Sequence, residues 1–269
     1  MITTFINYQS QVRGLSPRTC EEYQKNLGYF VTWARPRGYR WSTIWKGAID
    51  AYTAEMRANG LEASTIKVRI STLRTFYDWL VHEGKLEVNP VKYAQTPKMR
   101  ETLPTEADPQ LVDAWLEKPA TTADEKLTHM VAAIIIETGL RISEVLNLKR
   151  SDFQKCGILV RGKGGRERIV FYGNRTMEAL RAYAPAGNAI FPNVTQEQAR
   201  WAMYRTLGRE VRNVHPHQLR HTFAMERLNN GMALNEVGQL LGHKYLTTTQ
   251  IYARAATGTL QKHYQQTHS

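Results

Sequence analysis

The chain has 269 residues, of which 42% are hydrophobic and 22% charged, a composition typical of a folded protein and not of a disordered one. Its 36 Lys and Arg outnumber its 24 Asp and Glu by 12, which favours a polyanion such as nucleic acid as partner, although a merely basic protein fits that charge equally well. Two cysteines, Cys20 and Cys156, exclude a disulfide framework, and the longest apolar run, Met130 to Ile136, is too short to span a membrane. We therefore expect a cytoplasmic protein without a membrane segment.

The positive charge is concentrated in two zones of the sequence. Residues 1–98 carry 14 basic and 8 acidic side chains, and residues 149–181 carry nine and three. Each zone therefore has a surplus of six, and the remainder of the chain sums to zero. Two separated basic zones suggest two surfaces that face the same polyanion.

The first hundred residues are predicted to be helical. Ser16 followed by Pro17 is typical of a helix start, because Ser caps the first turn and Pro suits its first position. Apolar and aromatic residues then follow at a helical period, at Tyr23, Leu27, Phe30 and Ala34. A second helix is expected around residues 48–58, before Gly60.

A third helix is marked by an apolar face with steps of 4, 3, 4 and 3 residues, formed by Ile66, Ile70, Leu73, Tyr77 and Leu80. Basic side chains lie off this face. Charged residues in such positions usually only form the solvent-exposed face of a helix. Those near the start of this helix are all positive, so we take them as candidate phosphate contacts. Together with four basic residues of the second zone, the candidate DNA contacts are Lys67, Arg69, Arg74, Lys149, Arg150, Arg166 and Arg168.

The sequence predicts a helical domain at residues 1–95, a linker at 96–106, which has little periodicity, and a second domain at 107–269. The second domain begins with helices near 109–116 and 126–137. The segment "GILVRGKGGRERIVF" then places a Gly-Lys-Gly-Gly turn between two β-rich runs, which indicates a hairpin, and the pattern is helical again from Gln196. The predicted fold class is mainly α with a small antiparallel β-sheet.

Several side chains of the second domain are candidates for one reactive site: Arg141, Lys163, His217, Arg220, His243 and Tyr252. Taken singly, each has an ordinary explanation as a surface arginine, a turn lysine, a helix cap or a core tyrosine. His215 and His217 could also suggest a metal pair, but no cysteine or well-spaced carboxylate completes such a site.

Taken together, these residue types are what phosphoryl transfer without a metal ion requires. Two arginine forks can grip the non-bridging oxygens of a phosphodiester and neutralise its charge in the transition state. Ionising a tyrosine at pH 7 costs roughly 4 kcal/mol, so a base is needed, and His217 could accept the proton. A protonated Lys163 could supply the proton that a leaving deoxyribose oxygen needs.

The sequence resembles the tyrosine recombinases, or phage-integrase family, and within it the two-domain Xer-like members. The matching segments run in family order along nearly the whole chain: "LSPRTCEEYQKNL", "STIKVRISTLRTFYDWLVHEGKLEVNP", "TGLRISEVLNL", "RGKGGRERIV", "HPHQLRHTFA" and "LGHKYLTTTQIYARA". His217 to Arg220 corresponds to the family's His-x-x-Arg, His243 comes 26 residues after His217, and Tyr252 comes nine residues later.

The resemblance implies a helical SAM-like core-binding domain and a catalytic domain that close around DNA. Tyr252 would attack a scissile phosphate and leave a 3′-phosphotyrosyl bond with a free 5′-hydroxyl, so that rejoining needs no ATP, metal or other cofactor. The other implied roles are phosphate binding by Arg141 and Arg220, protonation of the leaving oxygen by Lys163, proton transfer by His217, and a phosphate hydrogen bond from His243. Glu144 occupies the family's acidic position and is expected to support the site.

The implied partners are double-stranded DNA recombination sites and further copies of the chain, which is expected to be a monomer in solution and a homotetramer on DNA that passes through a Holliday junction. The resemblance leaves open the site sequence, an accessory protein, docking of the C-terminal tail on a neighbour, and the choice between integration of a mobile element, dimer resolution and inversion. A type IB topoisomerase, a DNA-binding protein with an inactive site and a metal-dependent nuclease are the alternatives. The recombinase-like first domain, the filled catalytic positions and the lack of a carboxylate cluster argue against them in turn.

Overall fold

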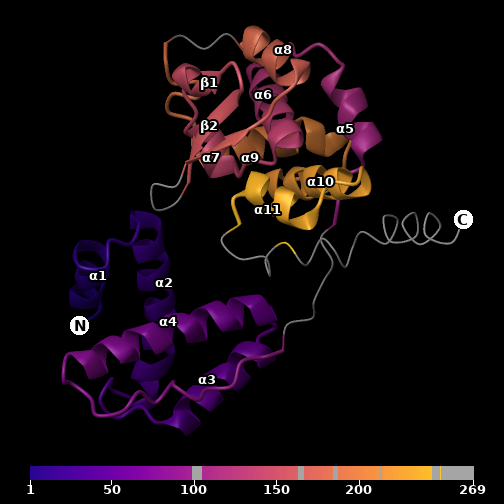
Figure 1. Cartoon of the computed structure of the whole chain (residues 1–269). Helices are drawn as coiled ribbons and strands as arrows, with labels where there is room; N and C mark the ends of the chain where they lie inside the picture. Colours follow the sequence, from indigo (N-terminus) through magenta and orange to yellow (C-terminus); the bar gives the residue numbers. More distant parts are fainter. Residues whose placement is uncertain (99–104, 163–166, 184–186, 213, 244–248, 250–269) are drawn as a thin grey trace, which may run out of the picture. The chain divides into compact units, whose positions relative to one another are not determined.

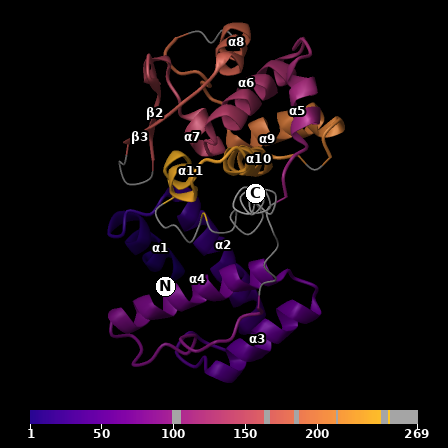
Figure 2. The same ribbon diagram turned by 45° about the vertical axis from the view of Figure 1, so that its right-hand side comes forward.

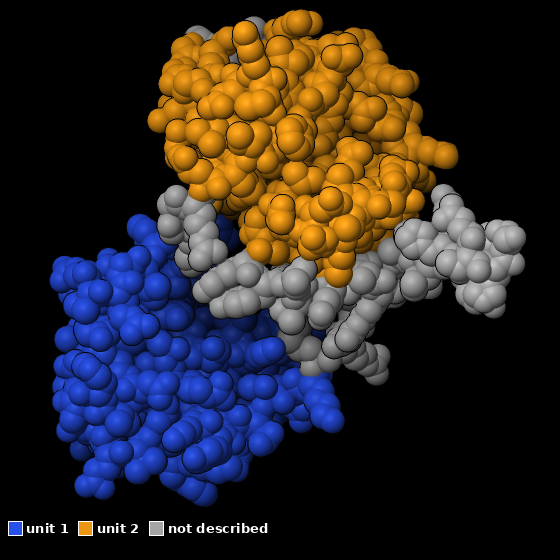
Figure 3. Space-filling view, in the orientation of Figure 1, with its two compact units in different colours: residues 1–101 blue, residues 102–269 orange. Residues whose placement is uncertain are grey.

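The computed structural model describes residues 1–98, 105–162, 167–183, 187–212, 214–243 and 249. The chain divides into two compact units, residues 1–101 and 102–269, coloured separately in Figure 3. Both are mainly helical, and the second adds a small antiparallel sheet, which confirms the predicted fold class (Figure 1). The linker predicted at 96–106 lies mostly outside the described residues and stays a prediction.

Unit 1 is built from helices around one aromatic-rich core. Its elements are α1 (Ile2–Gln11), α2 (Pro17–Ala34), η1 (Arg35–Arg37), α3 (Lys46–Ala58) and α4 (Ala63–His82). The predicted start of α2 is confirmed, because the Ser16 hydroxyl accepts a hydrogen bond from the backbone N–H of Thr19. The predicted apolar face of α4 is confirmed as well, since its five residues are at most 1% exposed. Burial of that face holds α4 in the unit.

Unit 2 is organised around α6 (Ala123–Thr138), which contacts α8 (Asn174–Tyr183), α9 (Gln196–Arg205) and α10 (Pro216–Asn229) (Figure 1). A capping box formed by Thr122 and Glu125 starts α6, and the run from Met130 to Ile136 is buried. The apolar run that is too short for a membrane is therefore a core helix. The remaining helical elements are α5 (Pro109–Leu116), α7 (Ile142–Leu146), η2 (Arg150–Asp152), η3 (Leu207–Arg209) and α11 (Leu234–Leu241).

The sheet contains the predicted hairpin. Its strands β1 (Phe153–Gln154), β2 (Gly157–Arg161) and β3 (Glu167–Val170) are antiparallel in the order β1-β2-β3. In the hairpin, Ile158 pairs with Val170 and Arg161 with Glu167. The sequence patterns did not indicate β1 or α8, and the turn at 163–166 lies outside the described residues. Figure 2 shows β2 and β3 beside each other, with α11 near β3.

No helix in the described part of the chain combines the length and apolar character that crossing a bilayer takes.

Candidate active site

Arg220 caps the ends of two helices. Its side chain lies on α10 and is 3% exposed. It donates one hydrogen bond to the carbonyl oxygen of Gly139, after α6, at 2.6 Å, and another to that of Leu241, the last residue of α11, at 2.7 Å. Carbonyls at helix C-termini lack partners within the helix, so a guanidinium there satisfies them. One buried positive charge therefore joins α6, α10 and α11.

Arg141 approaches the same carbonyl from another element. It is the N-cap of α7, and its side chain is 37% exposed. Its Nη1 donates to Glu144 Oε1 at 3.3 Å and to the Leu241 oxygen at 3.4 Å. The two predicted phosphate-binding arginines therefore converge on one carbonyl oxygen, one of them buried and the other open to solvent.

His243 completes this group at the end of α11. Its Nε2 lies 3.2 Å from Arg220 Nη2, and its Nδ1 lies 2.9 Å from the hydroxyl of Thr249, a fully buried residue. Because a guanidinium can only donate, Nε2 acts as acceptor and the ring proton lies on Nδ1. Burial, followed by the positive charges of Arg220 and Arg141, lowers the pKa of His243 to about 4. The imidazole is therefore neutral at pH 7.

His217 lies one turn before Arg220 on α10 and presents part of its ring to solvent. Partial desolvation and the charge of Arg220 lower its pKa below the usual 6.5, so its neutral form can accept a proton at pH 7. His215 has a local role, because its Nδ1 caps α10 by accepting from the Gln218 N–H at 3.2 Å. Within the described residues, no three His, Cys, Asp or Glu side chains are grouped to hold a metal ion.

Glu144 is the acidic centre of the group, with its side chain 9% exposed. Its carboxylate accepts two hydrogen bonds from Arg168, at 3.0 and 2.9 Å, and one from the backbone N–H of Arg141 at 2.9 Å. Burial acts to raise the pKa of Glu144, but the bonds from Arg168 and Arg141 outweigh it and leave the pKa lowered. Glu144 is therefore ionised. It forms ion pairs with all three arginines, Arg141, Arg168 and Arg220, the last with Nη1 3.9 Å from the carboxylate.

The structure thus brings Arg141, His217, Arg220, His243 and Glu144 together, and their catalytic and supporting roles stay predictions. Lys163 and Tyr252 lie outside the described residues. The sequence reasoning missed Thr249. Its only signal is a place three residues before Tyr252 in a run of threonines, and nothing in that run shows which hydroxyl is buried.

The candidate DNA contacts fall into two groups. Lys67, Lys149 and Arg150 are exposed, and Arg166 lies outside the described residues. The other three guanidiniums make contacts inside the fold. Arg69 lies 4.0 Å from the centre of the Tyr29 ring, Arg74 donates to the carbonyls of Val91 and Ala94 at 3.3 Å each, and Arg168 binds Glu144. These contacts give the second group roles within the fold besides any contact with DNA.

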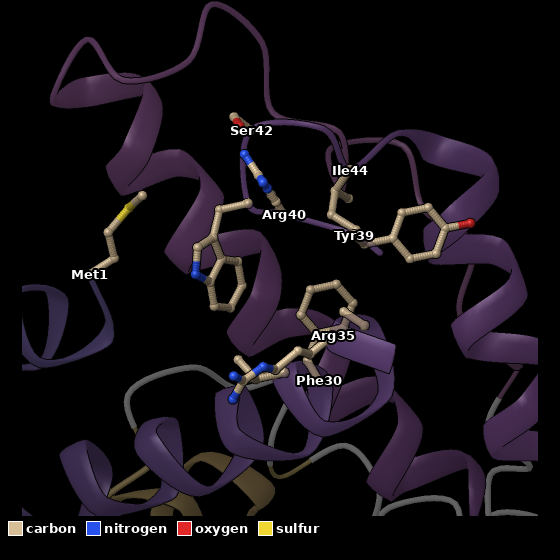
Figure 4. A pocket seen from close by; sticks show the side chains of 10 residues that line it. Met1, Phe30, Arg35, Tyr39, Arg40, Ser42 and Ile44 are labelled. Atoms are coloured by element: carbon tan, nitrogen blue, oxygen red, sulfur yellow. The ribbon is translucent and has the colours of Figure 1, made fainter. Parts of the chain in front are cut away.

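A pocket of about 400 Å³ lies in unit 1, away from these residues in the sequence (Figure 4). Its wall includes the Phe30 and Tyr39 rings, together with the Arg35 and Arg40 side chains. None of the candidate catalytic residues lines it. The chemistry of the arginine and histidine group therefore belongs to unit 2 and not to this pocket.

Comparison with known proteins identifies both units. Residues 103–258 match the model of the phage integrase family, and residues 2–84 match that of the phage integrase N-terminal SAM-like domain. Tyrosine recombinase XerC of Proteus mirabilis is 32% identical over 99% of this chain and 93% of its own. XerC of Salmonella typhi is 31% identical over 93% of this chain and 89% of its own.

Solved structures show the same fold. XerH site-specific recombinase, bound to its palindromic difH substrate after cleavage, matches with a TM-score of 0.74 at 20% identity, over 98% of this chain and 84% of its own. A lambda integrase dimer bound to a COC′ core site matches with a TM-score of 0.73 at 18% identity, over 93% of both chains. The chain therefore belongs to the phage integrase family and is a site-specific tyrosine recombinase.

Proposed function

We propose that this recombinase binds double-stranded DNA at recombination sites and cleaves and rejoins its strands through a 3′-phosphotyrosyl intermediate on Tyr252, without metal or ATP. The observation that carries the proposal is the convergence of Arg141 and Arg220 on the Leu241 carbonyl, with His243 3.2 Å from Arg220. A partly exposed guanidinium next to a buried one is suited to an anion that enters from solvent.

The charges of the group favour a phosphodiester. Arg141, Arg168 and Arg220 surround a single carboxylate, that of Glu144, so three positive charges meet one negative charge. The surplus lies in a partly desolvated setting, where interaction with an anion is stronger than in water. A phosphate held there would have its charge neutralised as the phosphorus becomes pentacoordinate.

The proton transfers follow from the states of the histidines. Tyr252 would give its proton to neutral His217 and form an O–P bond, while the P–O5′ bond breaks and Lys163 protonates the leaving oxygen. The phosphate charge would oppose the arginine charges that lower the His243 pKa. His243 would then take up a proton from solvent on Nε2 and donate a hydrogen bond to the phosphate, while Nδ1 keeps its bond to Thr249.

The partners of the reaction are proposed from relatives. XerH was captured on its difH substrate and lambda integrase on a core site, which supports DNA as the ligand of this chain. We further propose that protomers are monomeric in solution, form a homotetramer on two DNA sites and exchange strands through a Holliday junction. Exposed Lys67, Lys149 and Arg150 are the proposed backbone contacts.

The test uses a supercoiled plasmid that carries the DNA flanking the gene. Wild-type protein in EDTA should give an SDS-resistant protein–DNA adduct and recombinant circles, because both depend on the tyrosine linkage. Tyr252→Phe should give neither, and Tyr245→Phe, a matched loss of a nearby hydroxyl, should give both. An adduct that persists in Tyr252→Phe would contradict the assignment of the nucleophile, and relaxed plasmid without recombinants would indicate a topoisomerase.

A further inference from the structure

We propose that Arg168 is a positioning residue, which locks the β2–β3 hairpin to Glu144 and to the C-terminal end of α11 and keeps Glu144 from drawing the phosphate-binding arginines away. Its effect on cleavage rests on the function proposed above. The sequence pattern placed Arg168 among the DNA contacts, but the contacts of its side chain indicate this other role.

All three nitrogens of the Arg168 guanidinium donate hydrogen bonds within the protein. Nη1 and Nη2 donate to the two oxygens of Glu144 at 3.0 and 2.9 Å, and Nε donates to the Leu240 carbonyl at 2.9 Å. The Arg168 and Glu144 side chains are 16% and 9% exposed. A two-pronged pair with a third bond at Nε fixes the direction of the guanidinium, and a lysine cannot reproduce it.

The second observation is where these bonds meet. Arg168 caps the carbonyl of Leu240, and Arg141 and Arg220 cap the next one, that of Leu241. Gly242 follows in the left-handed region, with φ of +65°, and a Cβ there would lie 2.8 Å from Arg168 Nη1. Arg168 therefore packs directly under the turn that leads from α11 to His243.

The third observation is the balance of charge at Glu144. A buried carboxylate needs compensating charge, and Arg168 supplies it through both oxygens. Arg141 also bonds Glu144 at 3.3 Å, and Arg220 Nη1 lies 3.9 Å from it. Without Arg168, the charge of Glu144 would be compensated only by Arg141 and Arg220, the two arginines proposed to bind the phosphate. We therefore expect that a variant without Arg168 cleaves DNA slowly, and that removing the Glu144 charge as well restores part of the cleavage rate.

The fourth observation concerns the hairpin. Arg168 lies in β3 opposite Val160 of β2, and Lys163 comes between these two strands in the sequence. The bonds from Arg168 to α7 and α11 therefore anchor the strand that follows Lys163 in the chain. Arg161, in the adjacent pair of the ladder, is 56% exposed and pairs with Asp152 and Glu167. It offers a matched control on the same hairpin with the same change of charge.

The activity test measures single-turnover cleavage of a nicked duplex that carries the site found in the plasmid assay. Arg168→Gln should cleave at least about 100-fold more slowly with DNA affinity and its salt dependence unchanged. Arg168→Lys should cleave at a rate between those of Arg168→Gln and wild type. The double variant Arg168→Gln/Glu144→Gln should cleave about tenfold faster than Arg168→Gln alone. The control Arg161→Gln should cleave at the wild-type rate. Weaker binding with the salt slope reduced by about one, and no gain in the double variant, would make Arg168 a phosphate contact and overturn the proposal.

A second measurement does not depend on cleavage. The melting temperatures of wild type, Arg168→Gln, Glu144→Gln and the double variant form a cycle, and the double variant should lose clearly less than the sum of the single losses. Additive losses would show that the pair is not coupled and would overturn the proposal. If the two substitutions are coupled but the protein cleaves no DNA, the structural role of Arg168 would be supported and the proposed function would be rejected.

Discussion

At the scale of single residues, the site combines a surplus of positive charge with uncharged histidines. His221, on α10, shows the effect most simply, because burial and then the charges of His217, Arg220 and His215 lower its pKa to about 4. Desolvation and positive neighbours both oppose protonation of an imidazole. The folded protein therefore keeps a neutral ring at a pH at which the unfolded chain would already carry a proton.

This difference predicts how stability depends on pH. Below about 6.5 the unfolded chain protonates His221 and the folded protein does not, so stability falls with pH down to the folded pKa of about 4, where both states are protonated. His221→Gln should reduce this acid-induced loss of stability by about 1–2 kcal/mol. The effect is limited because the ring is only half-buried and solvent screens part of it. Urea unfolding of both proteins at pH 7 and pH 4.5 measures it. Equal losses in the two proteins would contradict the prediction.

At the scale of elements, the site depends on where helices end. Gly139 is the C-cap of α6, its φ is +66°, and its carbonyl accepts a bond from Arg220 at 2.6 Å. A Cβ at this position would lie 2.4 Å from the Phe223 ring and 2.9 Å from the Leu241 side chain. The glycine therefore serves both the left-handed backbone and the close approach of α10 and α11 to the end of α6.

Gly139→Ala should destabilise unit 2 by roughly 2–4 kcal/mol, because it adds steric overlap to backbone strain. Gly231→Ala is the matched control, since Gly231 has φ of +89° but open space where the Cβ would lie. It should cost only about 1 kcal/mol, the cost of the left-handed backbone. Guanidinium unfolding of both variants gives the comparison, and equal costs would mean that the packing around Gly139 yields easily.

At the scale of the whole molecule, the chain has two compact units with separate cores. The core of unit 1 includes fully buried Leu73, and that of unit 2 includes fully buried Ile134. Each core is enclosed by elements of its own unit. Units of this kind are expected to unfold as separate cooperative transitions.

Calorimetry of the full chain should therefore show two transitions. Leu73→Ala should lower one of them and Ile134→Ala the other, each by several degrees, since a buried Leu or Ile to Ala change costs roughly 2–5 kcal/mol. Each variant is the control for the other. A single transition that both substitutions lower to the same extent would show that the two cores unfold together.

The sequence by itself determined the features that local patterns encode. The steps of 4 and 3 residues from Ile66 to Leu80 predicted a buried helix face, Ser16 before Pro17 predicted a helix start, and the Gly-rich turn predicted the hairpin. Six short segments in family order, among them the one that contains His217 and Arg220, carried the family resemblance in the same way. These features could be predicted because each depends on residues close together in the chain.

Only the tertiary structure decided which basic side chains serve the fold. Arg161 and Arg168 lie in neighbouring strands of one hairpin and look alike in sequence, yet the first is 56% exposed and the second 16%. The difference comes from Glu144 and Leu240, which are 24 and 72 residues from Arg168 in the chain. Arg74 acquires its partners in the same way, from Val91 and Ala94, 17 and 20 residues away. Burial of a charge depends on what packs over it, and that is settled by contacts that no local pattern contains.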